Sequence, residues 1–275
     1  MLRAAYIRFK QLLPRSVRNA LSRVNQGLFA RRTIERKYGT WFDVDWRKKF
    51  RTMPDADWIA AYDAVWQHHH NNCTDETDAA MIITALGGAP HHDSTEQDAK
   101  KNAHVQNAHV QSVLEVGCGA GSLAIAMAQA GFRVTCVDVS SEALRKAAHR
   151  AQTLAVQGEQ TIKHDITWKQ GFAEALPFPD KSFDAITCCH TLEHVRDLQT
   201  TVQELKRVAR MRIVVVVPRQ EYRLYAENYH TQFFSTPDQL SSAFGLPRSE
   251  TRELNYVGRD NEFQDEALLY IGYVE

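Results

Sequence analysis

The spacing of apolar positions changes twice between residues 112 and 140 of this chain. Residues 113–116 form a short, mostly apolar run bounded by polar residues, which predicts a buried strand. The small and aliphatic residues of 123–128 favour a helix that ends at Gly131. A second apolar run at 133–137 predicts another strand. A strand, turn, helix and strand in this order indicate a parallel α/β sheet.

The rest of the chain continues this alternation of helices and strands. Ahead of the central segment, apolar stripes predict one helix after Pro54 and another at about 76–86. A capping-box sequence at Thr236, Pro237 and Gln239 predicts the start of a late helix. The other predicted elements are helices at about 142–156 and 197–209, and strands at 166–170, 183–189, 211–217, 251–256 and 267–274.

Composition narrows the class of protein. The chain has 275 residues, of which 44% are hydrophobic, with 33 basic and 33 acidic side chains. This length suffices for one α/β domain and an extension, and a net charge near zero argues against a general nucleic-acid binder. The five cysteines include the adjacent Cys188 and Cys189, fit no disulfide framework and indicate a reducing compartment. Because no run of about 18 apolar residues occurs, we expect a cytoplasmic protein without a transmembrane helix.

The first 34 residues differ from the rest in charge. They contain eight arginine and lysine residues, their apolar residues recur at helical spacing, and no acid precedes Glu35. A basic amphipathic segment of this kind can lie on an anionic membrane surface. It also fits an organellar transit peptide or a basic helix packed on the domain. Peripheral membrane association, a membrane-associated acceptor and organellar import therefore stay open.

The chain divides into four predicted parts. The basic segment 1–34 is followed by a helical N-terminal subdomain at 35–89, a polar linker at 90–111 and an α/β domain at 112–275. The linker contains the pentamer N-A-H-V-Q twice in tandem, which is typical of a surface segment that tolerates changes in length.

The histidines of the first half do not predict a metal centre. Three of them are consecutive at 68–70 and cannot all face one ion on a helix, and no spacing of cysteine and histidine matches a zinc site. We therefore expect no metal.

The turn after the first central strand contains the residues that indicate a ligand-binding site. It has the form G-x-G-x-G, with Gly117, Gly119 and Gly121, where a side chain would clash with the turn or with a ligand. The helix that follows directs backbone N–H groups toward whatever lies above the first strand. Asp138, at the end of the second strand, is placed to accept hydrogen bonds from a ribose diol. Together these features indicate a pocket for an adenosine-containing cofactor.

The sequence around this turn resembles a known family. E-V-G-C-G-A-G at 115–121 resembles the first motif of the class I S-adenosylmethionine-dependent methyltransferases, and Ser122 stands where a dinucleotide-binding turn has its third glycine. Segments at 171–178 (G-F-A-E-A-L-P-F), 191–195 (T-L-E-H-V) and 230–235 (H-T-Q-F-F-S) are similar to later parts of the same family. The resemblance implies a doubly wound, mostly parallel seven-strand α/β sheet with an antiparallel last strand, here with a helical N-terminal extension.

S-adenosylmethionine is the cofactor that the resemblance implies. Backbone groups of the turn are expected to bind its methionine end, Asp138 its ribose, and Val139 and Phe172 its adenine. Phe172 stands where the family commonly has an acid that meets the adenine amine, so the Ala173 backbone is expected to take that contact. The residues expected to bind the cofactor are Glu115, Gly117, Cys118, Gly119, Gly121, Asp138, Val139, Phe172, Ala173 and His190.

His194 and His230 are the candidate catalytic residues. They would act as a base if the acceptor is a hydroxyl, whereas an amine acceptor needs none. The resemblance implies methyl transfer to an oxygen or nitrogen atom of a small-molecule, lipid or glycan acceptor.

Two other classes of protein stay open from the sequence. An NAD-dependent oxidoreductase would share the glycine turn and Asp138, but it leaves the L-P-F segment and the closing strands unexplained. A non-catalytic cofactor-binding scaffold would keep the fold without turnover, and Phe172 is the residue that favours it.

Overall fold

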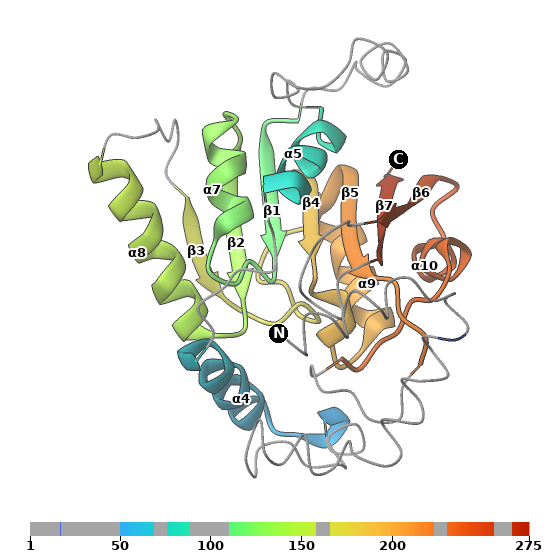
Figure 1. Ribbon diagram of the computed structural model, residues 1–275, viewed down its shortest axis with the longest axis horizontal. Coiled ribbons are helices and arrows are strands. Elements are labelled where there is room, and N and C mark those ends of the chain that lie inside the picture. The colour runs from blue at the N-terminus through green and yellow to red at the C-terminus, as the bar shows by residue number, and fades with distance from the viewer. Residues whose placement is uncertain are drawn as a thin grey trace.

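One sheet of seven strands forms the centre of the protein (Figure 1). The computed structural model describes Val17 and residues 50–68, 76–87, 110–157, 166–222, 230–255 and 266–274. The strands are β1 (Ser112–Val116), β2 (Arg133–Asp138), β3 (Thr167–Gln170), β4 (Phe183–Cys189), β5 (Ala209–Pro218), β6 (Arg248–Asn255) and β7 (Glu266–Tyr273). Most of the basic segment 1–34 and most of the predicted linker 90–111 lie outside the described residues.

The order of the strands in the sheet is β3-β2-β1-β4-β5-β7-β6. The strands β3, β2, β1, β4 and β5 pair in parallel, and β7 runs antiparallel to both of its neighbours. This confirms the predicted fold class, including the antiparallel last strand. The order reverses between β1 and β4, and ligands of open α/β sheets bind at such a switch point, beyond the carboxyl ends of the strands.

Helices cover both faces of the sheet (Figure 1). One apolar cluster packs α5 (Glu76–Ala85) and α7 (Ser122–Gln129) against the sheet, and α8 (Ser141–Gln157) contributes Leu144 to it. A second cluster, on the opposite face, contains side chains of α9 (Leu198–Val208) and α10 (Pro237–Phe244). The parallel strands are thereby buried on both sides, as their near-continuous apolar sequences require.

Strand β5 contributes side chains to both apolar clusters. Val214 and Val216 pack on the first cluster, and Ile213, Val215 and Val217 pack on the second. Successive side chains of a strand point to opposite faces, so the uninterrupted run of β-branched residues predicted a strand in the middle of the domain.

The helix α4 (Asp55–His68) lies beside the carboxyl edge of the sheet and is fixed there by Asp63. The Asp63 carboxylate accepts hydrogen bonds from the Ser140 hydroxyl (2.6 Å), the Ser141 hydroxyl (3.1 Å) and the backbone N–H of Glu142 (3.0 Å). These groups lie at the start of α8, so a side chain of α4 caps a helix that begins 78 positions further along the chain.

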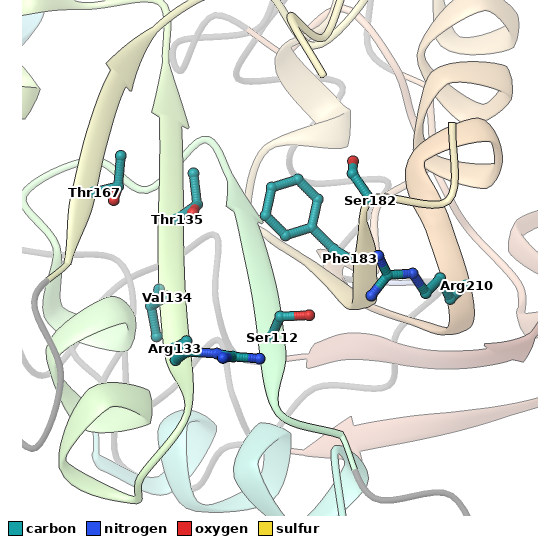
Figure 2. A pocket seen from close by; sticks show the side chains of 8 residues that line it. All are labelled: Ser112, Arg133, Val134, Thr135, Thr167, Ser182, Phe183 and Arg210. Atoms are coloured by element: carbon teal, nitrogen blue, oxygen red, sulfur yellow. The ribbon is translucent and has the colours of Figure 1, made fainter. Parts of the chain in front are cut away.

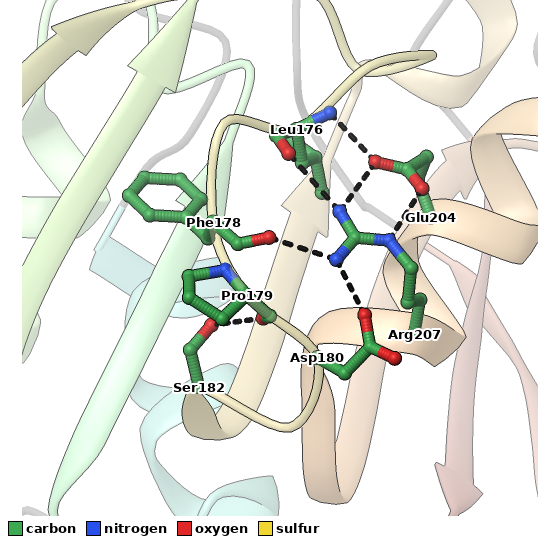
Figure 3. A network of polar contacts seen from close by, with 7 residues as sticks. All are labelled: Leu176, Phe178, Pro179, Asp180, Ser182, Glu204 and Arg207. Carbon is green, nitrogen blue, oxygen red and sulfur yellow. Dashed lines mark hydrogen bonds and ion pairs between the residues drawn. The ribbon is translucent and has the colours of Figure 1, made fainter.

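The L-P-F segment is fastened to α9 by Arg207 (Figure 3). The Arg207 guanidinium donates to the carbonyl oxygens of Leu176 (3.0 Å) and Phe178 (2.8 Å) and to the Asp180 carboxylate (2.9 Å). Glu204 binds the same guanidinium and accepts the Leu176 N–H at 2.8 Å. The segment that carries Phe172 therefore continues into a loop that Arg207 and Glu204 hold against α9.

A hollow of about 530 Å³ lies at the opposite edge of the sheet (Figure 2). Its lining includes the first residues of β1, β2, β4 and a residue near the start of β5, namely Ser112, Arg133, Phe183 and Arg210. Asp184 at this edge accepts the N–H and hydroxyl of Ser112, both at 2.9 Å. Because these are the amino ends of the strands, this hollow is not the predicted cofactor pocket.

Among the described residues, no helix is long and apolar enough to cross a membrane.

Candidate active site

The backbone N–H groups of the glycine turn are hydrogen-bonded to the end of β2. The N–H groups of Gly117 and Cys118 donate to the Val137 carbonyl oxygen at 2.7 and 3.3 Å, and the Gly119 N–H donates to Asp138 Oδ2 at 2.8 Å. This differs from the expectation that free N–H groups line the turn. The carbonyl oxygens of Gly117 and Gly119 each have one side-chain donor and keep a further lone pair, so the turn is suited to accept hydrogen bonds from the ammonium group of a methionine moiety.

Two of the glycines are required by conformation and by close approach. Gly117 and Gly119 have φ angles of 74° and 52°, which side chains disfavour. A β-carbon at Gly117 would lie 2.1 Å from the Thr191 hydroxyl oxygen, and one at Gly119 would lie 2.7 Å from the Trp66 ring. The turn is therefore packed tightly between the end of β4 and α4.

Asp138 connects this turn to the end of β2. Its carboxylate oxygens accept from the N–H of Gly119 and, at 2.9 Å, of Ser140, and the residue is only 7% exposed. Burial raises the pKa of Asp138 to about 6, and the two N–H groups act in the opposite direction. The side chain lies at the end of β2, as predicted, and its binding of ribose stays a prediction.

Glu115 lies below the turn, in β1. It is 3% exposed, and burial, followed by the charge of Asp138, raises its pKa well above the usual range. Burial likewise raises the pKa of the Cys118 thiol, so that cysteine is an inert part of the core. Both residues support the turn.

A small apolar cluster from α4 and from Phe50, which precedes it, packs against the two residues predicted to flank adenine. Phe50, Trp58 and Ala61 form a small buried cluster, against which Val139 and Phe172 pack. The two predicted adenine neighbours therefore meet the same cluster, although 33 positions separate them in the sequence. The apolar stripe of α4 is predictable from the sequence, but its place at the site is not, because a stripe alone does not show what it covers.

Arg196 is a further residue of the candidate site, and the sequence did not predict its place there. Its guanidinium lies over the Phe172 ring, 4.9 Å from the centroid, and 5.3 Å from the Trp58 ring centroid. It also pairs with Asp55 at 2.8 Å, and its backbone N–H donates to Glu174 at 2.8 Å. Arg196 thereby joins α4 to the segment that carries Phe172 and Ala173.

His190 stands at the tip of β4 in a strained conformation. Its φ of 52° is uncommon for a residue other than glycine, and its N–H donates to Val216 on the next strand. The ring is almost fully buried, with Nδ1 3.5 Å from Glu193 Oε1. Such backbone strain is found most often at functional sites.

The two candidate catalytic histidines come together next to this tip. His194 ends the 3-10 helix η4 (Leu192–His194), and its ring centroid lies 4.8 Å from that of His230 in an edge-on arrangement. Tyr62 of α4 lies on the other side of His194, with 6.1 Å between ring centroids. One ligand atom from each of Glu193, His194 and His230 lies within 4.8 Å of the others. We call these three residues the Glu-His-His cluster.

Hydrogen bonds fix the segment that carries Glu193 and His194 relative to the segment that carries His230. The backbone carbonyl of Glu193 accepts the N–H groups of Thr231 (2.7 Å) and Gln232 (3.0 Å). The Val195 carbonyl accepts the Thr231 hydroxyl at 2.6 Å and the Gln232 side-chain amide at 3.0 Å. The chain before α10 is therefore attached to the segment after β4, which could not be read from the spacing of His194 and His230.

The comparisons with known proteins agree with this geometry. Residues 114–216 match a family model described as a methyltransferase domain. An uncharacterized methyltransferase of Bacillus subtilis is 38% identical over 96 residues, which are 35% of each chain. A ubiquinone biosynthesis O-methyltransferase of Actinobacillus pleuropneumoniae is 39% identical over 98 residues, 35% of this chain and 40% of that protein. These matches span well under half the length of either relative.

A solved structure shows the same fold over a longer part of the chain. Magnesium protoporphyrin IX methyltransferase from Synechocystis, crystallised with bound SAH, aligns with a TM-score of 0.51 at 15% identity. The alignment covers 81% of this chain and all of that one.

The fold, the glycine turn and the family model agree with one another. Residues 114–216 match a methyltransferase domain, and the seven-strand sheet with its antiparallel last strand is the fold that the resemblance to the class I S-adenosylmethionine-dependent methyltransferases implies. The residues present fit S-adenosylmethionine as the cofactor, since those predicted to meet its ribose, methionine and adenine are a buried carboxylate, glycines in close contact and side chains packed on an aromatic cluster.

Proposed function

We propose that the protein transfers the methyl group of S-adenosylmethionine to a hydroxyl oxygen of its acceptor. The observation that carries this proposal is the meeting of His194 and His230 beside Glu193 at the switch point of the sheet. A hydroxyl must lose its proton when its oxygen is methylated, so proton-accepting groups are needed there. A neutral amine acceptor would not need such a cluster before methyl transfer.

When bound, S-adenosylmethionine supplies a methyl group on a positively charged sulfur. The acceptor oxygen forms the new C–O bond while the C–S bond breaks, and the sulfur keeps the electron pair. The Glu-His-His cluster takes up the hydroxyl proton. The remaining task of the protein is to hold the oxygen in line with the methyl group, which fits a cluster fixed by backbone hydrogen bonds.

Aromatic side chains beside the cluster support an apolar, ring-containing acceptor. Phe233 lies 6.5 Å from the His230 ring centroid and 5.5 Å from that of Tyr222, and Tyr222 is 68% exposed. Rings of a phenolic acceptor stack well on such side chains. The name of the Actinobacillus relative, an O-methyltransferase, agrees with the choice of oxygen.

Calorimetric titration with S-adenosylhomocysteine and, separately, NAD tests the cofactor. Binding of the homocysteine product to the wild type, with loss of binding in Asp138→Ala, is the expected result. Binding of NAD alone would instead favour an oxidoreductase, and binding of neither would favour a scaffold.

Methyl transfer from labelled S-adenosylmethionine to a panel of phenols and matched anilines tests the acceptor. We expect methylation of a phenol, with kcat lowered about 10²- to 10⁴-fold in His194→Ala and His230→Ala, the range typical of acid–base groups. His149→Ala, an exposed histidine of α8, is the matched control and should leave kcat unchanged. Unchanged kcat in both cluster variants, or methylation of anilines only, would contradict the proposal.

A further inference from the structure

We propose that Glu193, His194 and His230 bind one divalent first-row transition-metal ion. Each residue offers one ligand atom, and these atoms lie within 4.8 Å of one another. Two ligands of a tetrahedral ion at about 2.1 Å each are about 3.4 Å apart. The longest separation in the cluster therefore needs to shorten by about 1.4 Å for the three side chains to share one ion.

The state of Glu193 is the first argument for a cation. The residue is 2% exposed, and its Oε2 accepts no hydrogen bond from any described residue. Its Oε1 lies 3.5 Å from His190 Nδ1, and His190 Nε2 is also buried without a described hydrogen-bond partner. A buried carboxylate needs compensation by charge or hydrogen bonds. A metal ion on Oε2 would supply it.

The orientation of His230 is the second argument. Its Nδ1 lies 2.7 Å from Gln220 Oε1, and both residues are buried. With the amide oxygen as acceptor, Nδ1 carries the proton, and in the neutral ring Nε2 keeps its lone pair. Histidines that bind metals characteristically donate their other ring N–H to an oxygen in this way. Gln220 is therefore a positioning residue for the ligand.

The rigidity of the cluster is the third argument. The carbonyl of Glu193 and that of Val195 accept hydrogen bonds from Thr231 and Gln232, the residues that follow His230. The ligands come from two chain segments, and this attachment fixes their relative position before any ion arrives. A site prepared in this way loses little conformational entropy on binding.

The donor set indicates which ions would bind. Two imidazole nitrogens and one carboxylate oxygen suit Zn²⁺, Mn²⁺ or Fe²⁺ better than Ca²⁺, which prefers six or more oxygen ligands. Three protein ligands leave a coordination position for another oxygen, as catalytic rather than structural zinc sites do.

The role of the ion rests on the proposed function, whereas its binding does not. An acceptor hydroxyl bound at the open position would have a lowered pKa. Its proton would leave to water, and the oxygen would keep the electron pair that forms the bond to the methyl carbon. The sulfur would retain the pair of the broken C–S bond. In this form of the mechanism the imidazoles are ligands and the ion activates the hydroxyl.

Titration of the chelator-treated full chain with Zn²⁺ and with Mn²⁺, without cofactor or acceptor, tests the site. We expect one equivalent of ion bound, and at least tenfold weaker binding in Glu193→Gln and His230→Ala. Gln220→Ala should weaken binding about 10- to 100-fold, as expected for a partner of a ligand. Replacing the three consecutive histidines 68–70 with alanine removes their background binding and should leave this equivalent in place.

Thermal unfolding separates a metal site from a merely structural role. The ion should raise the Tm of the wild type and leave that of Glu193→Gln unchanged. Glu193→Gln keeps the shape and the backbone carbonyl, so without metal it should be at least as stable as the wild type. Equal metal binding in wild type and Glu193→Gln, or loss of binding only in the triple-histidine variant, would overturn the site. Full methyl transfer by the chelated protein would overturn the role of the ion alone.

Discussion

Asp138 is the residue whose ionisation should control cofactor binding. Its pKa is raised to about 6 by burial, above the usual value of about 3.9. Between these values the folded protein holds a proton that the unfolded chain has lost, so this group contributes less to stability as pH rises through that range. Above pH 6 the carboxylate is ionised and best able to accept hydrogen bonds from ribose hydroxyls.

Affinity for S-adenosylhomocysteine should therefore be constant above about pH 7 and fall below pH 6, by at most about tenfold per pH unit. Calorimetry from pH 5 to pH 8 measures this. Asp138→Asn should bind weakly with little dependence on pH, and Glu250→Gln on β6 should follow the wild type. An equally steep fall in Asp138→Asn would assign the titration to another group.

Substitution of Gly119 tests whether this position requires glycine because of its backbone conformation alone or also because of its contact with α4. Gly119→Ala should lower the free energy of unfolding by about 2–4 kcal/mol, since it combines a strained φ of 52° with a β-carbon 2.7 Å from the Trp66 ring. In a Trp66→Ala background the contact is gone, and the same change should lower it by only about 1–2 kcal/mol. Denaturant titrations of the four proteins measure the difference.

Gly245→Ala is the matched control for this cycle. Gly245 has a similar φ of 60°, but the nearest atom to an added β-carbon is 4.0 Å away. Its substitution should lower the free energy of unfolding by about 1–2 kcal/mol, the effect of conformation alone. If Gly119→Ala has the same effect with and without Trp66, the ring does not restrict the turn.

At the scale of elements, the sequence predicted most of the fold and only part of the site. The strand at 183–189 was placed at its observed bounds because an apolar run ends there at polar residues. The capping box at Thr236 also forms, although Gln239 reaches back to the N–H of Ser235 rather than of Thr236. The periodicity of apolar residues and the capping of helices depend on residues close together in the chain, so they can be predicted from a single sequence.

Contacts between distant segments could not be predicted in the same way. Nothing in the sequence near Arg196 indicates that its guanidinium covers Phe172, or that Asp63 caps α8. The meeting of Glu193 with His230 depends on hydrogen bonds between two loops. The expectation of no metal rested on the spacing of histidines along the chain. Such spacing shows only which residues are neighbours in the sequence, so it does not show that His194 and His230 meet in the fold.

Arg207 gives a test at this scale, since it joins α9 to the L-P-F segment (Figure 3). Lysine keeps the charge of Arg207 but cannot bind two carbonyl oxygens and two carboxylates at once. Arg207→Lys should lower the free energy of unfolding by about 1–3 kcal/mol and the Tm by about 3–8 °C. Arg145→Lys, at an exposed i,i+3 pair with Glu142, should change the Tm by less than about 2 °C.

Cofactor affinity distinguishes a local from a general effect of Arg207→Lys. The segment that Arg207 holds leads back to Phe172, so S-adenosylhomocysteine should bind more weakly at a temperature where the variant is fully folded. Equal Tm changes in Arg207→Lys and Arg145→Lys would show that the network in Figure 3 adds no stability beyond a surface pair.

At the scale of the whole molecule, the distribution of charge is uneven although the net charge is zero. Residues 1–34 hold eight of the 33 basic side chains and no acid, so the other residues together carry 25 basic and 33 acidic side chains, a net charge of −8. An anionic membrane would repel this remainder and attract the first segment. We propose that residues 1–34 bring the enzyme to an anionic surface, where an apolar acceptor would be dissolved.

Flotation with vesicles of phosphatidylglycerol and of phosphatidylcholine measures this. The full chain should float with the anionic vesicles at low salt and much less at about 0.5 M salt, because screening shortens the range of attraction to a few ångströms. A chain that lacks residues 1–34 should not float, while its affinity for S-adenosylhomocysteine should stay the same. A variant with Arg3, Arg8, Arg15 and Arg18 replaced by glutamine keeps the apolar residues of this segment and should float weakly. Equal flotation of the full and shortened chains would place the membrane contact elsewhere, and flotation of neither would remove the membrane from the proposal and leave a freely dissolved acceptor.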